Sequence, residues 1–503
     1  MMMRNSLLAA VAIVAGGALA KFAHPSNAPV DRIVKNLTSW VKSHPKDASA
    51  HFSLARAHGL AFALQSSQLM IYGDVEKDDR EIGVGDDYVQ KTYGIAKGTG
   101  VPIPTAKELA GHLDKGVAEF NALMNLDSKE GRYLLGFADL LDSGIARAAD
   151  AGVATIPGID DAKAPKEEVD RWNPVIDNLA SADEKVKSKA RDELRGDLTK
   201  AIRPLVARRA DANETIRKNV SDLIMEYWRE RSIDYYYDAF SLAFATEKSS
   251  EKQPMRGLSQ LVSHEAAVMY LKLVENRKNN SAQDKARVKE VKAALSKLKA
   301  LPPNTAMTPI VLSFEPSSTL SQLMSGQSAK FDLDGTGRSQ TWSWVKPETG
   351  ILCWDPDRAG KITSGRDLFG SVSWWIFFDT GYAAMDALDD NRDGCLAGDE
   401  LKGLAVWFDR NSDGISDAGE VLSVESLGIA SLSCRATADS EGCPSNPQGM
   451  TLADGRVLPT YDWIAKSVAE PAESPSQGLA WFTATAVLPI VLVARRRRRP
   501  ASL

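Results

Sequence analysis

The chain has 503 residues, of which 44% are hydrophobic and 25% are charged, and its formal net charge is −5. This length allows about two to four domains, each with its own core. The slightly acidic balance argues against a chain that binds nucleic acid as a whole, and the negative mean hydropathy excludes a polytopic membrane protein.

The N-terminus carries an export signal. An apolar run follows Arg4 and ends at Ala18-Leu19-Ala20. A basic start, an apolar stretch and small residues at its end are typical of a secretory signal peptide. We therefore predict a signal peptide over residues 1–20, with an uncleaved membrane anchor as the alternative.

Residues 21–145 predict a helical domain. Apolar residues recur at helical spacing on both sides of Pro45, which predicts a helical hairpin over residues 30–63. Residues 112–144 repeat this design around the break "NLDS". The intervening insertion, residues 65–111, contains an acidic patch that is typical of a solvated face.

The two hairpins resemble tetratricopeptide repeats. Leu54-Ala55 and Leu135-Gly136 stand where that family has its Leu-Gly pair. The resemblance implies a scaffold that contacts other proteins, and a generic bundle of helical hairpins is the alternative. Residues 146–305 predict a second helical domain, which ends at Pro302-Pro303.

Residues 306–465 have a different character. Short β-rich runs alternate with Asp-Gly and Glu-Thr-Gly turns, which predicts strands. Two acidic segments, 389–400 and 409–420, follow these runs. The fold class that we expect is mainly α, with helical hairpins, followed by a small α+β domain with EF-hand-type loops.

Both acidic segments have Asp, Asn, Asp, Gly and Glu at positions 1, 3, 5, 6 and 12. Calcium takes about six to eight oxygen ligands, and a short loop wraps the ion when its ligands alternate. The expected ligands of the first loop are Asp389, Asn391, Asp393, the carbonyl of Cys395, and Glu400. Those of the second loop are Asp409, Asn411, Asp413, the carbonyl of Ile415, Asp417 at position 9, and Glu420. We predict that Ca²⁺ is the cofactor; decayed loops that keep the turn without the ion are the alternative.

The eight residues between the loops, 401–408, predict one short helix that leaves the first site and enters the second. Such a helix is unstable alone. We therefore expect calcium to organise this domain rather than to switch it.

A larger pattern surrounds the loops. "FDLDGTG", "DPDRAGKITSGRDLFG", "ALDDNRDGCLAGDEL" and "VWFDRNSDGISDAGEVLSVESLGIASL" follow one another over residues 331–432. This order resembles the EF-hand-type calcium-binding block of large secreted bacterial proteins. The resemblance implies further loops at Asp332 and Asp355, which we expect to be structural turns or weak sites. Some of these secreted proteins carry toxin-type glycine-rich repeats; this sequence lacks such repeats, so a toxin role does not follow.

The four cysteines are Cys353, Cys395, Cys434 and Cys443. Oxidation is expected in an exported chain. We predict a disulfide between Cys434 and Cys443, which are close in sequence, and leave the other two open.

The C-terminus predicts a membrane anchor. After a linker over residues 466–477, residues 478–494 carry no charge, and five Arg follow at 495–499. An apolar span with an Arg cluster behind it predicts a single-pass helix with a short cytoplasmic tail in the segment 478–503. A buried core helix is the alternative.

No catalytic constellation is visible. His264-Glu265 suggests a zinc protease, but the second His of that motif is missing. We therefore expect no enzyme, but an exported, membrane-anchored calcium-binding protein of the cell envelope or surface, which contacts a protein partner through its helices and binds no nucleic acid. The alternatives are an envelope hydrolase with Ca²⁺ as a structural staple and a surface-layer component.

Overall fold

The computed structural model of the protein describes residues 26–64, 68–70, 106–127, 129–147, 164–249, 257–275, 277, 280–300, 307–316 and 318–468. The predicted signal peptide, most of the predicted insertion at 65–111, the predicted linker beyond residue 468 and the segment 478–503 lie outside these residues. Contacts divide the chain into Met1–Val468 and Ala469–Leu503, so every described residue belongs to the first part.

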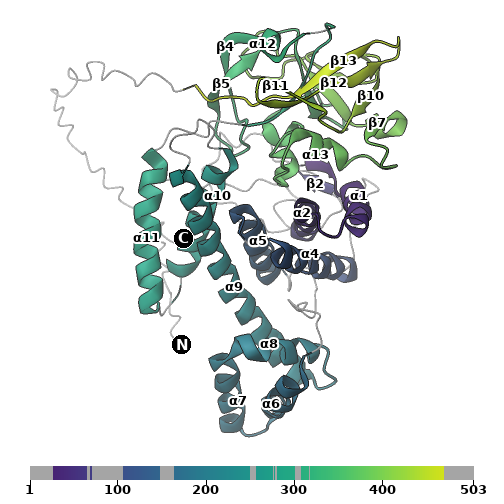
Figure 1. The fold of residues 1–503 in the computed structure, drawn as a ribbon. Helices are drawn as coiled ribbons and strands as arrows, with labels where there is room; N and C mark the ends of the chain where they lie inside the picture. Colours follow the sequence, from purple (N-terminus) through teal and green to yellow (C-terminus); the bar gives the residue numbers. More distant parts are fainter. Residues whose placement is uncertain are drawn as a thin grey trace, which may run out of the picture. The chain divides into compact units, whose positions relative to one another are not determined.

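The described N-terminal part is mainly helical (Figure 1). Its helices are α1 (Val30–Ser43), α2 (Ala48–Leu64), α4 (Ala106–Leu126), α5 (Gly131–Arg147), α6 (Lys166–Asp177), η1 (Asn178–Ala180), α7 (Glu184–Gly196), α8 (Leu198–Ala207), α9 (Glu214–Ser249), α10 (Gly257–Glu275) and α11 (Ala282–Ala300). A short ribbon of β1 (Ser26–Pro29) and β2 (Gln68–Met70) precedes and follows the first hairpin.

The predicted hairpins are confirmed as pairs of helices. The first breaks at Pro45, which lies between α1 and α2, and the second breaks between Leu126 and Gly131. Helix α4 begins earlier than the sequence suggested, at Ala106 inside the predicted insertion. The likeness to tetratricopeptide repeats stays a prediction.

The C-terminal part is an antiparallel sheet domain with short helices, which confirms the strands that the alternating turns predict. Its strands are β3 (Ile310–Leu312), β4 (Met324–Phe331), β5 (Gln340–Val345), β6 (Gly350–Trp354), β7 (Cys395–Ala397), β8 (Leu404–Trp407), β9 (Val421–Ser423), β10 (Ile429–Ser433), β11 (Ala438–Ser440), β12 (Cys443–Leu452) and β13 (Val457–Asp462). The large sheet has the order β7-β10-β12-β13-β3-β6-β8-β9, with β11 on β12, and β4 pairs with β5 separately. Its short helices are α12 (Leu320–Leu323), η2 (Gly365–Asp367), η3 (Ser373–Trp375), α13 (Gly381–Asp386) and η4 (Gly398–Leu401).

The predicted helix between the two acidic loops is wrong. Residues Leu404–Trp407 form strand β8, which pairs with both β6 and β9. All four side chains of β8 are buried. As an inner strand with a neighbour on each side, β8 has its backbone groups hydrogen-bonded along both edges, and both of its faces are covered. Gly403, at φ +88°, ends the preceding turn in a conformation that suits glycine.

One core joins the helical part to the sheet domain. Ile33 and Leu37 of α1 belong to the same buried cluster as Leu388, Leu396 and Leu401, which flank or form the first acidic loop. Figure 1 shows α1 and α2 next to α13, which immediately precedes that loop. The described parts of the predicted N-terminal and C-terminal domains therefore fold against each other.

The predicted disulfide is wrong. Cys434 and Cys443 are both free thiols, as are Cys353 and Cys395. Cys434 packs in the cluster around Leu432, whereas Cys443 packs in the cluster that contains Trp463. The two thiols therefore belong to different buried clusters.

The predicted membrane anchor also requires correction. Among the residues that the structure describes, no helix is both long enough and apolar enough to cross a membrane. The prediction of a single-pass, membrane-anchored protein is therefore wrong for this part of the chain, and residues 478–494 themselves lie outside it.

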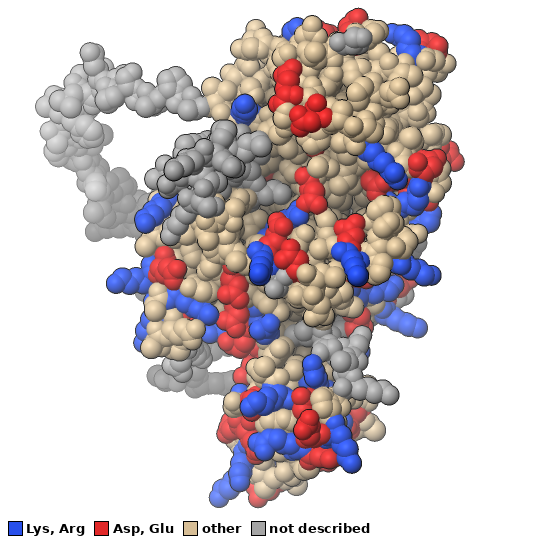
Figure 2. All heavy atoms as spheres, viewed as in Figure 1, with Lys and Arg blue, Asp and Glu red and all other residues tan. Residues whose placement is uncertain are grey.

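Figure 2 shows Lys and Arg mixed with Asp and Glu on the face in view, above all near α6, α7 and α8.

Candidate functional site

The two acidic loops adopt the same backbone conformation. In the first loop (residues 389–400) the amide of Gly394 donates to Asp389 Oδ2 over 2.7 Å. In the second loop (residues 409–420) the amide of Gly414 donates to Asp409 Oδ2 over 2.8 Å. Both glycines have positive φ, +89° and +76°, as the sharp turn at position 6 requires.

The glutamate at position 12 closes each loop in the same way. Glu400 Oε1 accepts the amide of Asp390 over 2.7 Å, and Glu400 Oε2 accepts the amide of Ala397 over 3.1 Å. In the second loop, Glu420 Oε1 accepts the amide of Arg410, also over 2.7 Å. The closing carboxylate therefore ties the start and the end of each loop together.

Positions 3 and 5 also match. Asn391 Oδ1 accepts the amide of Asp393 over 2.8 Å, and Asp393 Oδ1 accepts the amide of Cys395 over 2.9 Å. The corresponding bonds at Asn411 and Asp413 measure 3.2 and 2.8 Å. Each of these oxygens accepts one bond from the backbone of its own loop.

Positions 7 and 9 complete the set of predicted ligands. The backbone of Cys395 and of Ile415 continues each turn, and the Ile415 side chain is 59% exposed. Asp417, at position 9, donates its amide to Glu420 Oε2 over 3.0 Å, and its carboxylate accepts the Asn411 amide group over 3.1 Å. Asp417 therefore lies within its loop.

The prediction of an EF-hand, metal-binding protein requires correction for the described residues. In the part of the chain that the structure describes, no group of three or more His, Cys, Asp or Glu side chains could hold a metal ion as it stands. The physical reason is that the acidic side chains accept hydrogen bonds from the backbone of their loops. Glu400, for example, accepts the amides of Asp390, Asn391 and Ala397. The acidic side chains hold their own loops instead of gathering around one point.

The donor set nevertheless suits calcium in kind. Every predicted side-chain ligand offers a carboxylate or amide oxygen, which hard cations prefer. Most of these oxygens, such as Asp389 Oδ1 and Asp389 Oδ2, accept a single bond and keep a second lone pair. An ion that replaced part of the backbone bonding at Glu400 and Glu420 would find oxygen ligands in both loops.

Helix α1 borders the first loop. Arg32 donates to the carbonyl of Leu388, which precedes the loop, to the carbonyl of Glu400 over 3.2 Å, and to Asp390 Oδ1 over 3.0 Å. Asn36 donates to the same Asp390 Oδ1 over 2.9 Å. Residues more than 350 positions away in sequence therefore contact both ends of the loop.

Tryptophans border the second loop. Trp344 Nε1 donates to Asp409 Oδ2 over 2.6 Å, and Trp407 Nε1 donates to Glu420 Oε2 over 3.4 Å. Asp409 is fully buried, and this burial raises its pKa. Sequence reasoning missed Trp344 because no local spacing connects position 344 to a loop that begins at 409.

The two upstream loops share the first turn. Gly337 donates its amide to Asp332 Oδ2, and Gly360 donates to Asp355 Oδ2, both over 2.9 Å. Burial and the neighbouring Asp334 raise the pKa of Asp332 to about 7. These loops have the expected turn geometry, and whether they bind an ion stays a prediction.

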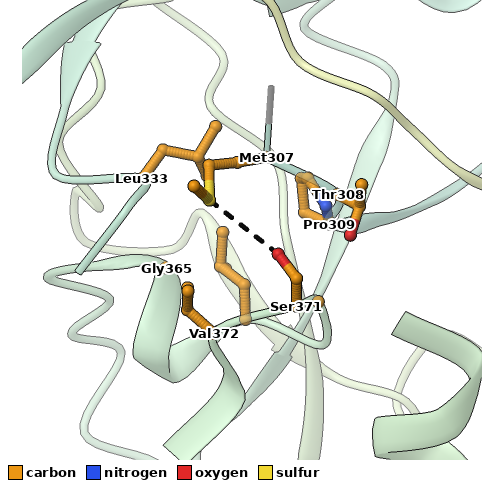
Figure 3. A pocket seen from close by; sticks show the side chains of 9 residues that line it. Met307, Thr308, Pro309, Leu333, Gly365, Ser371 and Val372 are labelled. Atoms are coloured by element: carbon orange, nitrogen blue, oxygen red, sulfur yellow. Dashed lines mark hydrogen bonds between the residues drawn. The ribbon is translucent and has the colours of Figure 1, made fainter. Parts of the chain in front are cut away.

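One small hollow among the described residues of the sheet domain is too small for a ligand. It measures about 10 Å³ and is lined by residues such as Met307, Leu333 and Val372 (Figure 3). The Ser371 hydroxyl donates to the sulfur of Met307 across it, over 3.8 Å. Such a space holds at most about one water molecule.

Residues 314–458, which include both loops, match the model of the SPM domain family. This is not an EF-hand family, so the resemblance of residues 331–432 to an EF-hand-type block stays a prediction. The iron-regulated protein FrpA of Neisseria meningitidis serogroup C is 38% identical over 109 residues, which are 21% of this chain and 10% of that protein. The chain thus spans about a tenth of the length of this curated relative.

Proposed function

We propose that the SPM-matching sheet domain binds two calcium ions, one in each acidic loop. One observation carries this proposal: two segments 20 positions apart adopt the same hydrogen-bonded loop, with corresponding bonds at positions 1, 3, 5 and 12. The oxygens at these positions are also of the kind that calcium prefers, and their order is that of a calcium-binding loop.

Binding requires the closing glutamate side chains to rearrange. Glu400 and Glu420 must exchange part of their bonding to backbone amides for bonding to the ion. This exchange lowers the net gain, so the affinity is modest, with Kd about 10⁻⁵ to 10⁻³ M, as in extracellular calcium modules. Calcium bound to the folded domain adds to its stability by mass action.

We further propose that the helical part acts as a scaffold for this domain. The buried Arg56 of α2 donates to the carbonyl of Trp375 over 2.8 Å, and the buried Arg132 of α5 donates to the carbonyl of Phe377 over 3.0 Å. Trp375 and Phe377 have φ values of +60° and +66°, which are strained for bulky residues. The two arginines support this segment from outside the sheet domain.

Calorimetric titration of the whole protein with CaCl₂ tests the calcium proposal. We expect two ions for the unaltered protein, one for Glu400→Gln, one for Glu420→Gln, and none for the double variant, since each change removes the closing carboxylate of one loop. Asp399→Asn is the matched control, because Asp399 is an exposed neighbour outside the ligand set. Absence of binding heat at millimolar Ca²⁺ would refute the proposal, as would two ions bound by the double variant.

A further inference from the structure

Helix α1 and the first acidic loop are joined by bonds in both directions. From the helix, the guanidinium of Arg32 reaches the carbonyls of Leu388 and Glu400, which stand at the two ends of the loop. From the loop, the guanidinium of Arg392 donates to the backbone carbonyl of Asn36 and lies 5.3 Å from the centre of the Trp40 ring. The helix therefore restrains the distance between the ends of the loop.

The apolar side of α1 makes this contact permanent in the folded protein. Ile33 and Leu37 are buried together with Leu388, Leu396 and Leu401. These residues precede, lie within and follow the first loop. A rearrangement of the loop backbone therefore changes the packing of α1, and loss of α1 would loosen the loop.

The second loop has no such contact with α1 among the described residues. Its position 2 is Arg410, which donates to the carbonyl of Gly419 within the same loop over 2.8 Å. At position 2 of the first loop, Asp390 instead accepts bonds from Arg32 and Asn36. The sequence difference at position 2 thus separates a loop that contacts α1 from a loop that closes on itself.

We propose that Arg32 and Asn36 are positioning residues for calcium in the first loop, so that ion binding there and the docking of α1 stabilise each other. The inference rests on the proposed calcium binding. The second loop binds its ion independently of α1. The N-terminal helices are thereby held on the sheet domain more firmly when the first loop is filled.

The sign of the effect follows from the contacts. A guanidinium near a calcium site repels the ion, so by charge alone the loss of Arg32 would tighten binding. Asp390, which is not a ligand, neutralises Arg32 at 3.0 Å and is accessible to solvent, which weakens that repulsion. The restraint on both loop ends remains, and it favours binding because a preorganised loop loses less freedom when the ion enters.

Single-loop proteins separate the two sites for the test. In the Glu420→Gln background only the first loop binds, and we expect Arg32→Ala with Asn36→Ala to raise its calcium Kd about 10-fold, a typical coupling. In the Glu400→Gln background the same pair leaves the Kd of the second loop unchanged. Lys35→Ala, on an exposed position of α1, is the matched control and changes neither. Arg32→Lys keeps the charge but not the forked contacts, so it also weakens the first loop.

Unchanged or tighter binding at the first loop in the α1 variants would overturn the coupling and leave the calcium proposal standing. Failure of both single-loop parents to bind would refute the calcium proposal itself.

Hydrogen exchange checks the reciprocal effect without any change in α1. We expect calcium to slow exchange of the amides of Val30–Ser43 in the unaltered protein and in Glu420→Gln, but not in Glu400→Gln. Exchange that is independent of calcium in all three proteins would overturn the coupling.

Discussion

The two acidic loops have the same internal hydrogen bonds but different neighbours. Within each loop, the position 1 carboxylate accepts the position 6 amide over 2.7 or 2.8 Å, and the position 12 carboxylate accepts the position 2 amide over 2.7 Å. Outside, the first loop contacts a helix from the opposite end of the described chain, whereas the second contacts the indole groups of Trp344 and Trp407. The local sequence therefore determines the conformation of each loop, whereas the tertiary fold determines which distant residues contact it.

This difference has a structural origin. The first loop leads into β7, which pairs with β10 at the edge of the large sheet, close to α1. The second loop lies between β8 and β9, beside the packed aromatic side chains of Trp344 on β5 and Trp407 on β8. Both loops therefore lie at an edge of the large sheet, and they differ in what borders them: α1 at the first loop, and the tryptophans of its own domain at the second. We therefore expect changes around the second loop to cost more stability.

The largest contrast concerns the glycine at position 6. A Cβ at Gly414 would lie 2.3 Å from the carbonyl oxygen of Lys330, whereas at Gly394 it would meet the movable side chain of Arg435 at 3.0 Å. Gly414→Ala therefore combines a positive-φ penalty with a backbone clash, and we expect it to lower the free energy of unfolding by about 2–5 kcal/mol. Gly394→Ala should lose only about 1–2 kcal/mol.

Urea unfolding in the presence of a chelator measures both variants without a contribution from calcium. Equal losses in the two loops would show that their surroundings do not differ in rigidity as described.

A smaller effect is expected from the tryptophan beside the second loop. Trp344→Phe removes the N–H that donates to the buried Asp409 Oδ2, which should cost about 1–3 kcal/mol of unfolding free energy. Because Asp409 loses a positioning bond, calcium affinity should fall in the second loop and not in the first.

Trp342→Phe is the matched control for this change. Trp342 lies on the same strand and is equally buried, but its indole N–H donates to the carbonyl of Phe331. It should lower stability without selective loss of calcium affinity at the second loop. A similar affinity loss in both variants would attribute the effect to core packing instead of the bond to Asp409.

How far the sequence predicts the site depends on the distance between partners. The spacing of Asp389, Gly394 and Glu400 is local, and the structure has the local bonds that go with it: the Gly394 amide donates to Asp389, and the Asp390 amide donates to Glu400. The contact between Arg32 and Asp390 is not visible in sequence, because it depends on how α1 packs on the sheet domain.

The helix predicted over residues 401–408 shows a second limit. The apolar run around Val406 is compatible with a helix or with a buried strand when read alone. Val406 pairs with Leu352, which lies on strand β6 more than 50 positions earlier, and this pairing makes the segment a strand. The disulfide prediction failed for the same reason, since closeness of Cys434 and Cys443 in sequence did not place them in one cluster.

Calcium binding is tested most directly by anomalous X-ray scattering from crystals of the protein grown with calcium. The proposed binding of two calcium ions requires one anomalous peak bounded by the carboxylates of Asp389 and Glu400, and a second peak bounded by those of Asp409 and Glu420. Electron density that shows both loops closed on their own amides, with no anomalous peak at either loop in millimolar calcium, would contradict it.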